Sequence, residues 1–289
     1  MPAVVGIHGI GCENYTPEGL TRTWNRAIDK GLLEIGHSTQ LDFSCVGYGH
    51  LFLTERKGLP APTTVEDLDE FEVELLLDLA QPLAAAPMSH SRSSPKGVVR
   101  RGYAPRNVQW MLEQLARHPS LGETGFTFVL RLLHQVRLYL ADLPLRESVH
   151  AEVEAVVGAD TRVVVGHSLG SVVAYDALRR HPEWQVDTLV TLGSPLGVPG
   201  LMRRMWPPLD GERWPGSVTR WVNVAAREDA VALVKELATL YDPPRTHPHV
   251  PRLRDDIVRN SRVRAHRAES YLQARPTARA IRDGLGGRG

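Results

Sequence analysis

The residues best suited to carry out chemistry in this chain are the five from Gly166 to Gly170, which read G-H-S-L-G. The β-branched run at 161–165 before them predicts a buried strand, and the pattern at 171–180 after them predicts a helix. A tight turn between a strand and a helix strains the backbone of its central residue, and glycines on either side avoid collisions with the two elements. Negative charge is favoured at the N-terminus of the helix that follows. We therefore predict that Ser168 is a nucleophile whose hydroxyl group is lifted out of the sheet.

A serine nucleophile needs a general base, and the base needs a carboxylate that orients it. The carboxylate is expected just beyond the end of a strand. Asp229 follows the predicted strand at 219–226 and precedes a helical pattern, so we predict that it is the acid. Glu228 stays open as the alternative, because a small error in the loop would exchange the two residues.

Three histidines follow Asp229 in the chain and are candidates for the base. His266 follows the last predicted strand and opens the last predicted helix, and we predict that it is the base. His247 and His249 are the other candidates, in a Pro-rich stretch that is typical of an irregular connection. No further cluster of ligands supports a metal site at these two histidines, so we expect neither a metal nor another cofactor.

Two backbone N–H groups are expected to stabilise the negative charge that develops during attack on a carbonyl group. One is the N–H of Leu169, the residue after the nucleophile. The other is expected in the loop after the first predicted strand, at 3–8, where the sequence continues through a His-Gly pair. We predict the N–H of Ile10 as this second donor, with Gly9 as the alternative, and we interpret His8 as ordering the loop.

Strand patterns alternate with helical patterns along most of the chain. This alternation is typical of a parallel sheet with helices on both faces. We expect a single α/β domain over 1–289, with a mostly parallel central sheet of about six to seven strands. The predicted strands are 3–8, 41–47, 161–166, 186–193, 219–226 and 255–260. The predicted helices outside the interval 60–158 are 18–33, 169–180, 229–241 and 267–285. We expect Pro276 to kink or split the last of these helices.

The interval at 60–158 is too long for one crossover connection, and it contains several helical patterns. We expect a helical cap-like insertion that covers part of the candidate site while its apolar stripe packs on the sheet. A capping box from Thr63 to Glu66 predicts the start of an acidic helix, and the composition at 88–106 predicts an exposed loop. The other helical segments are 107–117, 124–141 and 145–157, and the stripe consists of Phe126, Val129, Leu130, Leu133, Val136 and Leu140.

The composition suits a globular protein and points to no charged partner. Of the 289 residues, 42% are hydrophobic and 23% are charged, and the net charge is +1, so we expect no nucleic-acid partner. Residues 63–80 include seven acidic and no basic residues, whereas residues 245–289 include eleven arginines and four acidic residues. We interpret these as two solvated faces, with contact between the basic end and an anionic partner or membrane surface as the alternative.

The cysteines and the apolar segments of the sequence indicate the cellular compartment of the protein. Cys12 and Cys45 are the only cysteines and no C-x-x-C motif is present, so we expect buried thiols and no disulfide framework. No signal-peptide pattern and no apolar run long enough to span a bilayer is visible. We therefore expect a cytoplasmic protein without a transmembrane segment.

Several of these blocks together resemble the α/β-hydrolase superfamily, and within it the lipase- and esterase-like serine hydrolases. The resemblance implies that the nucleophile, the acid and the histidine follow one another in this order along the chain. It also implies metal-independent cleavage of a carboxylic ester through an acyl-enzyme on Ser168. The blocks are 6–11, the G-H-S-L-G motif, 191–195, 223–233 and His266 with Tyr271-Leu272.

Other functions fit the same residues. A peptidase, an amidase or a thioesterase would use the same three groups on a different small-molecule or acyl substrate. A partner-binding module that has the fold without the activity is the alternative from a different class, and the presence of all three candidate residues argues against it. The region 60–158 contains no transferable motif, and substrate choice is expected to be encoded there.

Overall fold

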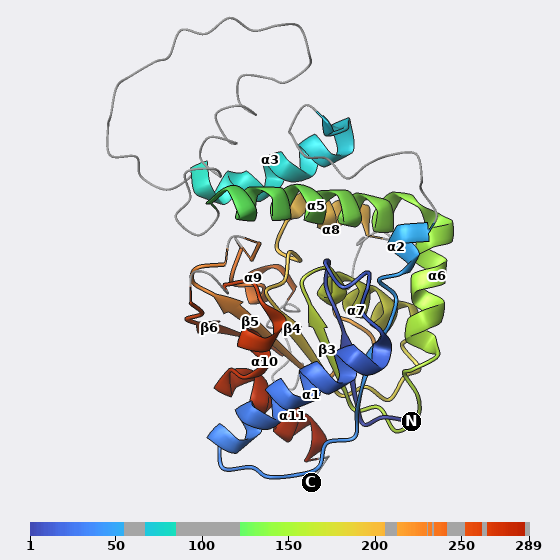
Figure 1. Ribbon diagram of the computed structural model, residues 1–289, viewed down its shortest axis with the longest axis vertical. Coiled ribbons are helices and arrows are strands. Elements are labelled where there is room, and N and C mark those ends of the chain that lie inside the picture. The colour runs from blue at the N-terminus through green and yellow to red at the C-terminus, as the bar shows by residue number, and fades with distance from the viewer. Residues whose placement is uncertain are drawn as a thin grey trace, which may run out of the picture.

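The computed structural model describes residues 1–54, 67–84, 122–205, 213–229, 231–232, 234–241, 252–261 and 265–286. These residues contain a six-stranded sheet with the order β2-β1-β3-β4-β5-β6, in which every pair of neighbouring strands is parallel (Figure 1). The strands are β1 Val4–Ile7, β2 Phe43–Val46, β3 Val163–His167, β4 Thr188–Leu192, β5 Arg220–Ala226 and β6 Arg252–Val258.

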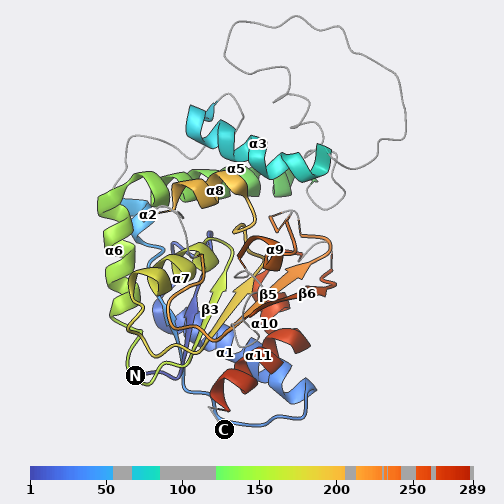
Figure 2. The same ribbon diagram turned by 180° about the vertical axis from the view of Figure 1, so that it is seen from behind.

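Helices cover both faces of the sheet, and for this reason every residue of β1, β3 and β4 is buried (Figures 1 and 2). Alternate residues of a strand point to opposite faces: Val163 and Val165 join one apolar core, and Val164 joins the other. The first core includes side chains of α1 Pro17–Glu34, α10 Ala268–Leu272 and α11 Arg275–Leu285, and the second includes side chains of α5 Gly122–Ala141, α6 Leu143–Glu154 and α7 Leu169–Arg180.

The remaining helices lie around the edge at which the strands end. Figure 2 shows α3, Glu70–Ala84, beside α5, and both lie above the sheet together with α8, Pro199–Arg204. α2, Leu51–Thr54, follows β2, and α9, Ala238–Tyr241, lies between β5 and β6 in the chain.

The parallel α/β architecture predicted from the sequence is confirmed. Each predicted strand is present, although the last one lies at Arg252–Val258 and not at 255–260. The predicted helix at 267–285 is split into α10 and α11, and Pro276 lies in the first turn of α11, where its missing N–H costs nothing.

The prediction of a helix at 229–241 is wrong. Among its described residues only Ala238–Tyr241 are helical. The ammonium group of Lys235 donates to the backbone carbonyl groups of Ala226, Asp229 and Ala232 over 2.9, 3.1 and 2.9 Å. A side chain thus occupies carbonyl groups that a helix would pair with backbone N–H groups, and the segment folds as an irregular loop.

Some of the helical patterns predicted within 60–158 are present as helices. α3, α5 and α6 correspond to helical patterns within 60–158, and the side chains of the apolar stripe from Val129 to Leu140 are buried. A reciprocal capping box starts α3: Glu72 N donates to Asp69 Oδ1 over 2.9 Å, and Asp69 N donates to Glu72 Oε2 over 3.0 Å. The predicted capping box at 63–66, the loop at 88–106, the helix at 107–117 and the side chain of Phe126 lie outside the described residues.

The described part of the acidic stretch is solvated only in part: Glu74 is exposed and Asp69 is partly exposed, whereas Glu72 and Asp78 are largely covered. Four of its carboxylates contact basic side chains of the helices α5 and α8, because α3 packs against both of these helices. The ion pairs are Asp69 with Arg137, Glu74 with Arg204 and Asp78 with Arg203, and Glu72 is hydrogen-bonded to His134.

Candidate active site

Ser168 lies at the junction of β3 and α7 with φ 54° and ψ −126°, and no other described non-glycine residue has a positive φ. The positions on either side of this turn, 166 and 170, have room only for glycine, because a side chain there would collide with the backbone. A Cβ atom on Gly166 would lie 2.6 Å from the carbonyl oxygen of Gly170, and a Cβ atom on Gly170 would lie 2.1 Å from the carbonyl oxygen of Ile7. The strained serine and its two glycines therefore have the local geometry expected from the sequence.

Asp229 and His266 form a hydrogen-bonded pair. His266 Nδ1 donates to Asp229 Oδ2 over 2.7 Å, and the N–H of Val231 donates to Asp229 Oδ1 over 2.8 Å. Glu228, the alternative acid, has a buried Oε2 atom without a hydrogen-bond partner in the described part of the chain. The structure thus brings Asp229, and not Glu228, onto His266.

The surroundings of Asp229 favour its charged form. Burial raises the pKa of the carboxyl group, but the charge and hydrogen bond of His266 lower it, as do the hydrogen bonds from Tyr271 and from the N–H of Val231. The net effect is a pKa below the usual value. Asp229 is therefore an ionised, buried carboxylate that holds one proton of the imidazole ring.

Two contacts connect this pair to the turn that contains Ser168. The N–H of Ser168 donates to the carbonyl group of Leu192, the last residue of β4, over 3.0 Å. Gly193 follows Leu192, and a Cβ atom on Gly193 would lie 2.9 Å from Asp229 Oδ2 and 3.2 Å from His266 Cε1. His167 Nε2 donates to the carbonyl group of His266 over 2.9 Å. His167, the residue before Ser168, and Gly193, the residue after β4, thus both lie against the acid–histidine pair.

His167 is held neutral in this position. Burial lowers its pKa to about 3, and the charge of His266 adds to this effect. The imidazole ring therefore acts as a fixed donor to the backbone of His266 and does not compete with it as a base.

The two atoms that would react have unused hydrogen-bonding capacity. Ser168 Oγ and His266 Nε2 are buried, and neither has a hydrogen-bond partner among the residues that the structure describes. A serine–histidine hydrogen bond that is absent in the free protein is common, because such bonds tighten when substrate binds.

The loop after β1 lies against Ser168. A Cβ atom on Gly9 would lie 2.7 Å from Ser168 Cβ and 3.0 Å from the carbonyl oxygen of His167, so only a glycine fits at this position. His8 Nδ1 donates to the carbonyl group of Gly9 over 2.7 Å, and its ring stacks on Tyr48 with 4.2 Å between centroids. Burial lowers the pKa of His8 to about 4, so the ring is neutral near pH 7.

The two predicted N–H donors directly follow the two residues of this contact in the chain. Ile10 follows Gly9 and packs against the apolar core. Leu169 is the first residue of α7, and an N–H group in the first turn of a helix has no acceptor within the helix.

Helix α5 extends from His266 to the loop after β1. The ring of Phe128 meets His266 edge-on with 4.9 Å between centroids. Two turns further along α5, Gln135 Nε2 donates to Glu13 Oε1 over 2.5 Å, and the same carboxylate oxygen accepts the N–H of Gly11 over 3.1 Å. α5 is therefore tied both to the histidine and to the loop that faces Ser168.

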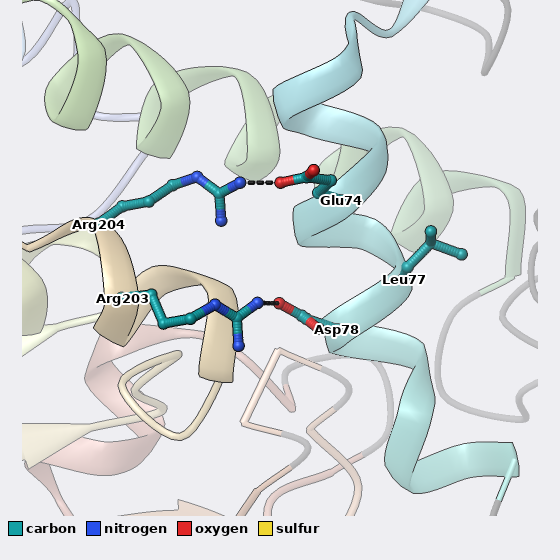
Figure 3. Close-up of a pocket in the computed structure, with 5 residues that line it drawn as sticks. All are labelled: Glu74, Leu77, Asp78, Arg203 and Arg204. Carbon is teal, nitrogen blue, oxygen red and sulfur yellow. Dashed lines mark hydrogen bonds and ion pairs between the residues drawn. The ribbon is translucent and has the colours of Figure 1, made fainter.

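Figure 3 shows an open surface pocket between α3 and α8, with a volume of about 610 Å³. It contains two ion pairs, and Arg203 Nη2 lies 2.9 Å from Asp78 Oδ2 in one of them. None of its lining residues is a candidate site residue, so we interpret the pocket as part of the contact between these helices. The lining residues are Glu74, Leu77, Asp78, Arg203 and Arg204.

The other candidates from the sequence are not part of this cluster. His247 and His249 lie outside the described residues. Within the described ranges, no three His, Cys, Asp or Glu side chains are grouped so that they could hold a metal ion. Cys12 and Cys45 are free thiols, and burial raises the pKa of both, to about 12 for Cys12. None of the described helices has both the length and the apolar character needed to cross a membrane.

Sequence reasoning missed three contacts of the site. It gave no role to His167, to Phe128 or to Tyr271, although all three side chains touch His266 or Asp229. The position of His167 inside the G-H-S-L-G motif was the only signal for its contact. Phe128 and Tyr271 fall at apolar helix positions, which are typical of core residues.

Neither a protein-family model nor a curated protein sequence matches this chain. The geometry of the cluster around Ser168 therefore carries the functional argument that follows.

Proposed function

We propose that this protein is a serine hydrolase of the α/β-hydrolase type that cleaves a carboxylic ester through an acyl-enzyme on Ser168. The carrying observation is the strained Ser168, whose neighbour in the chain, His167, contacts His266. His266 is hydrogen-bonded to the buried Asp229, and its Nε2 atom has no hydrogen-bond partner among the described residues. Backbone strain and buried titratable groups tend to gather at functional sites, and here they coincide.

In the proposed reaction, Ser168 Oγ attacks the carbonyl carbon while its proton moves to His266 Nε2. The tetrahedral intermediate collapses, the bond to the leaving oxygen breaks, and His266 returns the proton to the departing alcohol. A water molecule then attacks the acyl-enzyme and gives a proton to His266. The acid is released, and Ser168 regains its proton.

Asp229 and the backbone support these steps. The negative carboxylate of Asp229 stabilises the imidazolium ion and fixes the tautomer in which Nε2 accepts a proton. The N–H groups of Leu169 and Ile10 bind the developing oxyanion. The contact between Gly9 and Ser168 supports the placement of this loop at the reacting carbonyl group.

We further propose that α3 and α5 belong to a cap over the site. The contacts of α5 with His266 and with Glu13 support this view. Phe128 presents an aromatic ring to the histidine, which favours an apolar substrate group at this position. Hydrolysis of an amide, a peptide or a thioester by the same groups is the alternative, and a panel of such substrates with different acyl chain lengths distinguishes them.

The proposal is tested by labelling with a fluorophosphonate, which reacts with activated serine hydroxyl groups. The wild-type protein should gain the mass of the probe on the peptide that contains Ser168, and Ser168→Ala should gain none. An unlabelled wild-type protein, or equal labelling of Ser168→Ala, would contradict the proposal and favour a partner-binding module.

Gly9→Ala should lower kcat/KM for ester hydrolysis on the order of 100-fold, because the added methyl group displaces the loop or Ser168 and small misplacements are costly. Initial rates with a chromogenic ester measure the effect. Gly286→Ala is the matched control, since its added methyl group meets only ordinary contacts at 3.5 Å or more. Equal rates for Gly9→Ala and Gly286→Ala would show that the loop does not approach the reacting group.

A further inference from the structure

Tyr271 shares a carboxylate oxygen of Asp229 with His266. The hydroxyl group of Tyr271 donates to Asp229 Oδ2 over 2.5 Å, and His266 Nδ1 donates to the same oxygen over 2.7 Å. Tyr271 is fully buried on α10, the helix that follows His266. The oxygen that holds the imidazole ring therefore receives two hydrogen bonds.

The direction of the tyrosine proton is fixed by the backbone. The N–H of Ala226, the last residue of β5, donates to the hydroxyl oxygen of Tyr271 over 2.9 Å. Because that oxygen accepts from Ala226, its own proton is directed to Asp229. Burial and the charge of Asp229 raise the pKa of Tyr271 well above its ordinary value, so the phenol stays protonated in the neutral range.

The hydrogen bond from Tyr271 weakens the hydrogen bond between Asp229 and His266. A carboxylate oxygen that accepts two hydrogen bonds divides its charge between the two donors, so each bond is weaker than a single one would be. The Tyr271 hydroxyl group thus reduces the stabilisation that Asp229 gives to an imidazolium ion. Among the described residues, Lys235 and Glu228 are charged groups that act on Asp229 and Tyr271, and the neutral ring of His167 contacts His266.

We propose that Tyr271 is a positioning residue of this site, which orients Asp229 toward His266 and sets the pH at which activity is lost on the acidic side. The inference rests on the proposed function, in which His266 must be neutral to accept the proton of Ser168. Stronger stabilisation of the imidazolium ion moves the loss of activity to higher pH, and weaker stabilisation moves it to lower pH.

The chain offers a matched control for the loss of such a hydroxyl group. Tyr139 donates to Oδ2 of the buried Asp176 over 2.6 Å, and His150 Nε2 lies 2.9 Å from the same oxygen. This second Asp–His–Tyr arrangement is part of the contact between α5, α6 and α7, and none of its members contacts Ser168, Asp229 or His266 through a hydrogen bond in the described structure.

The test is the pH dependence of ester hydrolysis for wild type, Tyr271→Phe and Tyr139→Phe. For Tyr271→Phe we expect kcat/KM about 10-fold lower on the pH plateau and an acidic limb about half a pH unit higher, because a hydrogen bond to a charged group is lost. Tyr139→Phe should lose thermal stability and keep the acidic limb of the wild type. An acidic limb that is the same in Tyr271→Phe and wild type would overturn the inference.

A second variant covers the case in which Tyr271→Phe does not fold. 3-Fluorotyrosine in place of Tyr271 preserves the shape of the side chain and donates a stronger hydrogen bond, so the acidic limb should move to lower pH. An unmoved limb would overturn the inference.

A spectroscopic measurement separates this inference from the proposed function. The proton shared by His266 and Asp229 should give a low-field NMR signal that moves further downfield in Tyr271→Phe. An unmoved signal would show that Tyr271 has no effect on the pair and would overturn the inference. If the wild-type protein is not labelled by a fluorophosphonate, the proposed function fails, and the NMR signal still decides the coupling of Tyr271 to the pair.

Discussion

Asp229→Asn should lower kcat for ester hydrolysis by about 10⁴-fold while leaving the protein folded. The carboxylate now accepts the proton of His266 Nδ1 over 2.7 Å. An asparagine can turn its NH2 group toward Nδ1, and the imidazole ring then carries its proton on Nε2. In that tautomer His266 cannot accept the proton of Ser168, so the loss concerns the chemical step and not substrate binding.

Glu228→Gln is the control, because Glu228 is the neighbouring carboxylate and has no hydrogen bond to His266. It should keep kcat within a few-fold of the wild type, since it removes no contact of the reacting groups. Saturation kinetics with a chromogenic ester, together with circular dichroism, measure both variants. A loss under 10-fold for Asp229→Asn, or a larger loss for Glu228→Gln, would move the role of the acid away from Asp229.

The strands and the turn at Ser168 could be predicted because their signals are local. The β-branched run before Gly166 and the two glycines around Ser168 specify a strand, a strained turn and a helix within one short segment. Parallel strands place their carboxyl ends at one edge of the sheet, so residues just beyond those ends come together. Asp229 follows β5 closely and His266 follows β6 in the chain, so the sequence alone could predict that these two residues lie at the same edge of the sheet.

The errors arise where distant residues decide the local structure. The periodic apolar residues after Asp229 favour a helix, but the ammonium group of Lys235 binds carbonyl groups of this segment and stabilises a loop. The acidic residues of α3 pair with α5 and α8, which are remote in sequence, and composition alone cannot show such pairs. The role of Tyr271 depends on the backbone of Ala226 and on Asp229, and neither contact leaves a pattern in the sequence.

The contact between the helices α5, α6 and α7 is stabilised by a buried carboxylate, that of Asp176. Asp176 of α7 is fully buried, and it accepts hydrogen bonds from Arg146 Nε and Nη2 of α6 over 2.7 and 2.6 Å. Tyr139 of α5 donates to the same carboxylate over 2.6 Å. Because α7 begins at Leu169, directly after Ser168, this contact joins α5 and α6 to the helix that supports the candidate nucleophile.

The protonation of Asp176 links this contact to pH. Burial raises its pKa, but the hydrogen bonds and charges of His150 and Arg146 lower it to below the usual value. A carboxyl group whose pKa is lower in the folded state than in the unfolded state stabilises the fold above the unfolded value of about 3.9. That stabilisation is lost as the pH falls through the folded value, so the wild-type protein should lose stability in acid partly through Asp176.

Asp176→Asn should lower the free energy of unfolding by about 3 to 5 kcal/mol at pH 7, because it removes the carboxylate that accepts two hydrogen bonds from the buried guanidinium group of Arg146. Glu147→Gln is the matched control: Glu147 makes the same two-bond contact with Arg180 at the surface, at 3.0 and 2.9 Å, and its loss should cost at most about 1 kcal/mol. Urea unfolding at pH 7 measures both values, and the same series at lower pH should show a weaker pH dependence for Asp176→Asn.

A double variant separates the cost of losing Asp176 alone from the value of the Arg146–Asp176 pair. Replacing both partners by apolar residues of similar size, as Arg146→Met with Asp176→Leu, should restore much of the stability that Asp176→Asn loses, because no charge is then buried alone. Equal losses for Asp176→Asn and Glu147→Gln would contradict this account. A double variant less stable than Asp176→Asn would show that the ion pair itself determines the stability of the contact between α6 and α7.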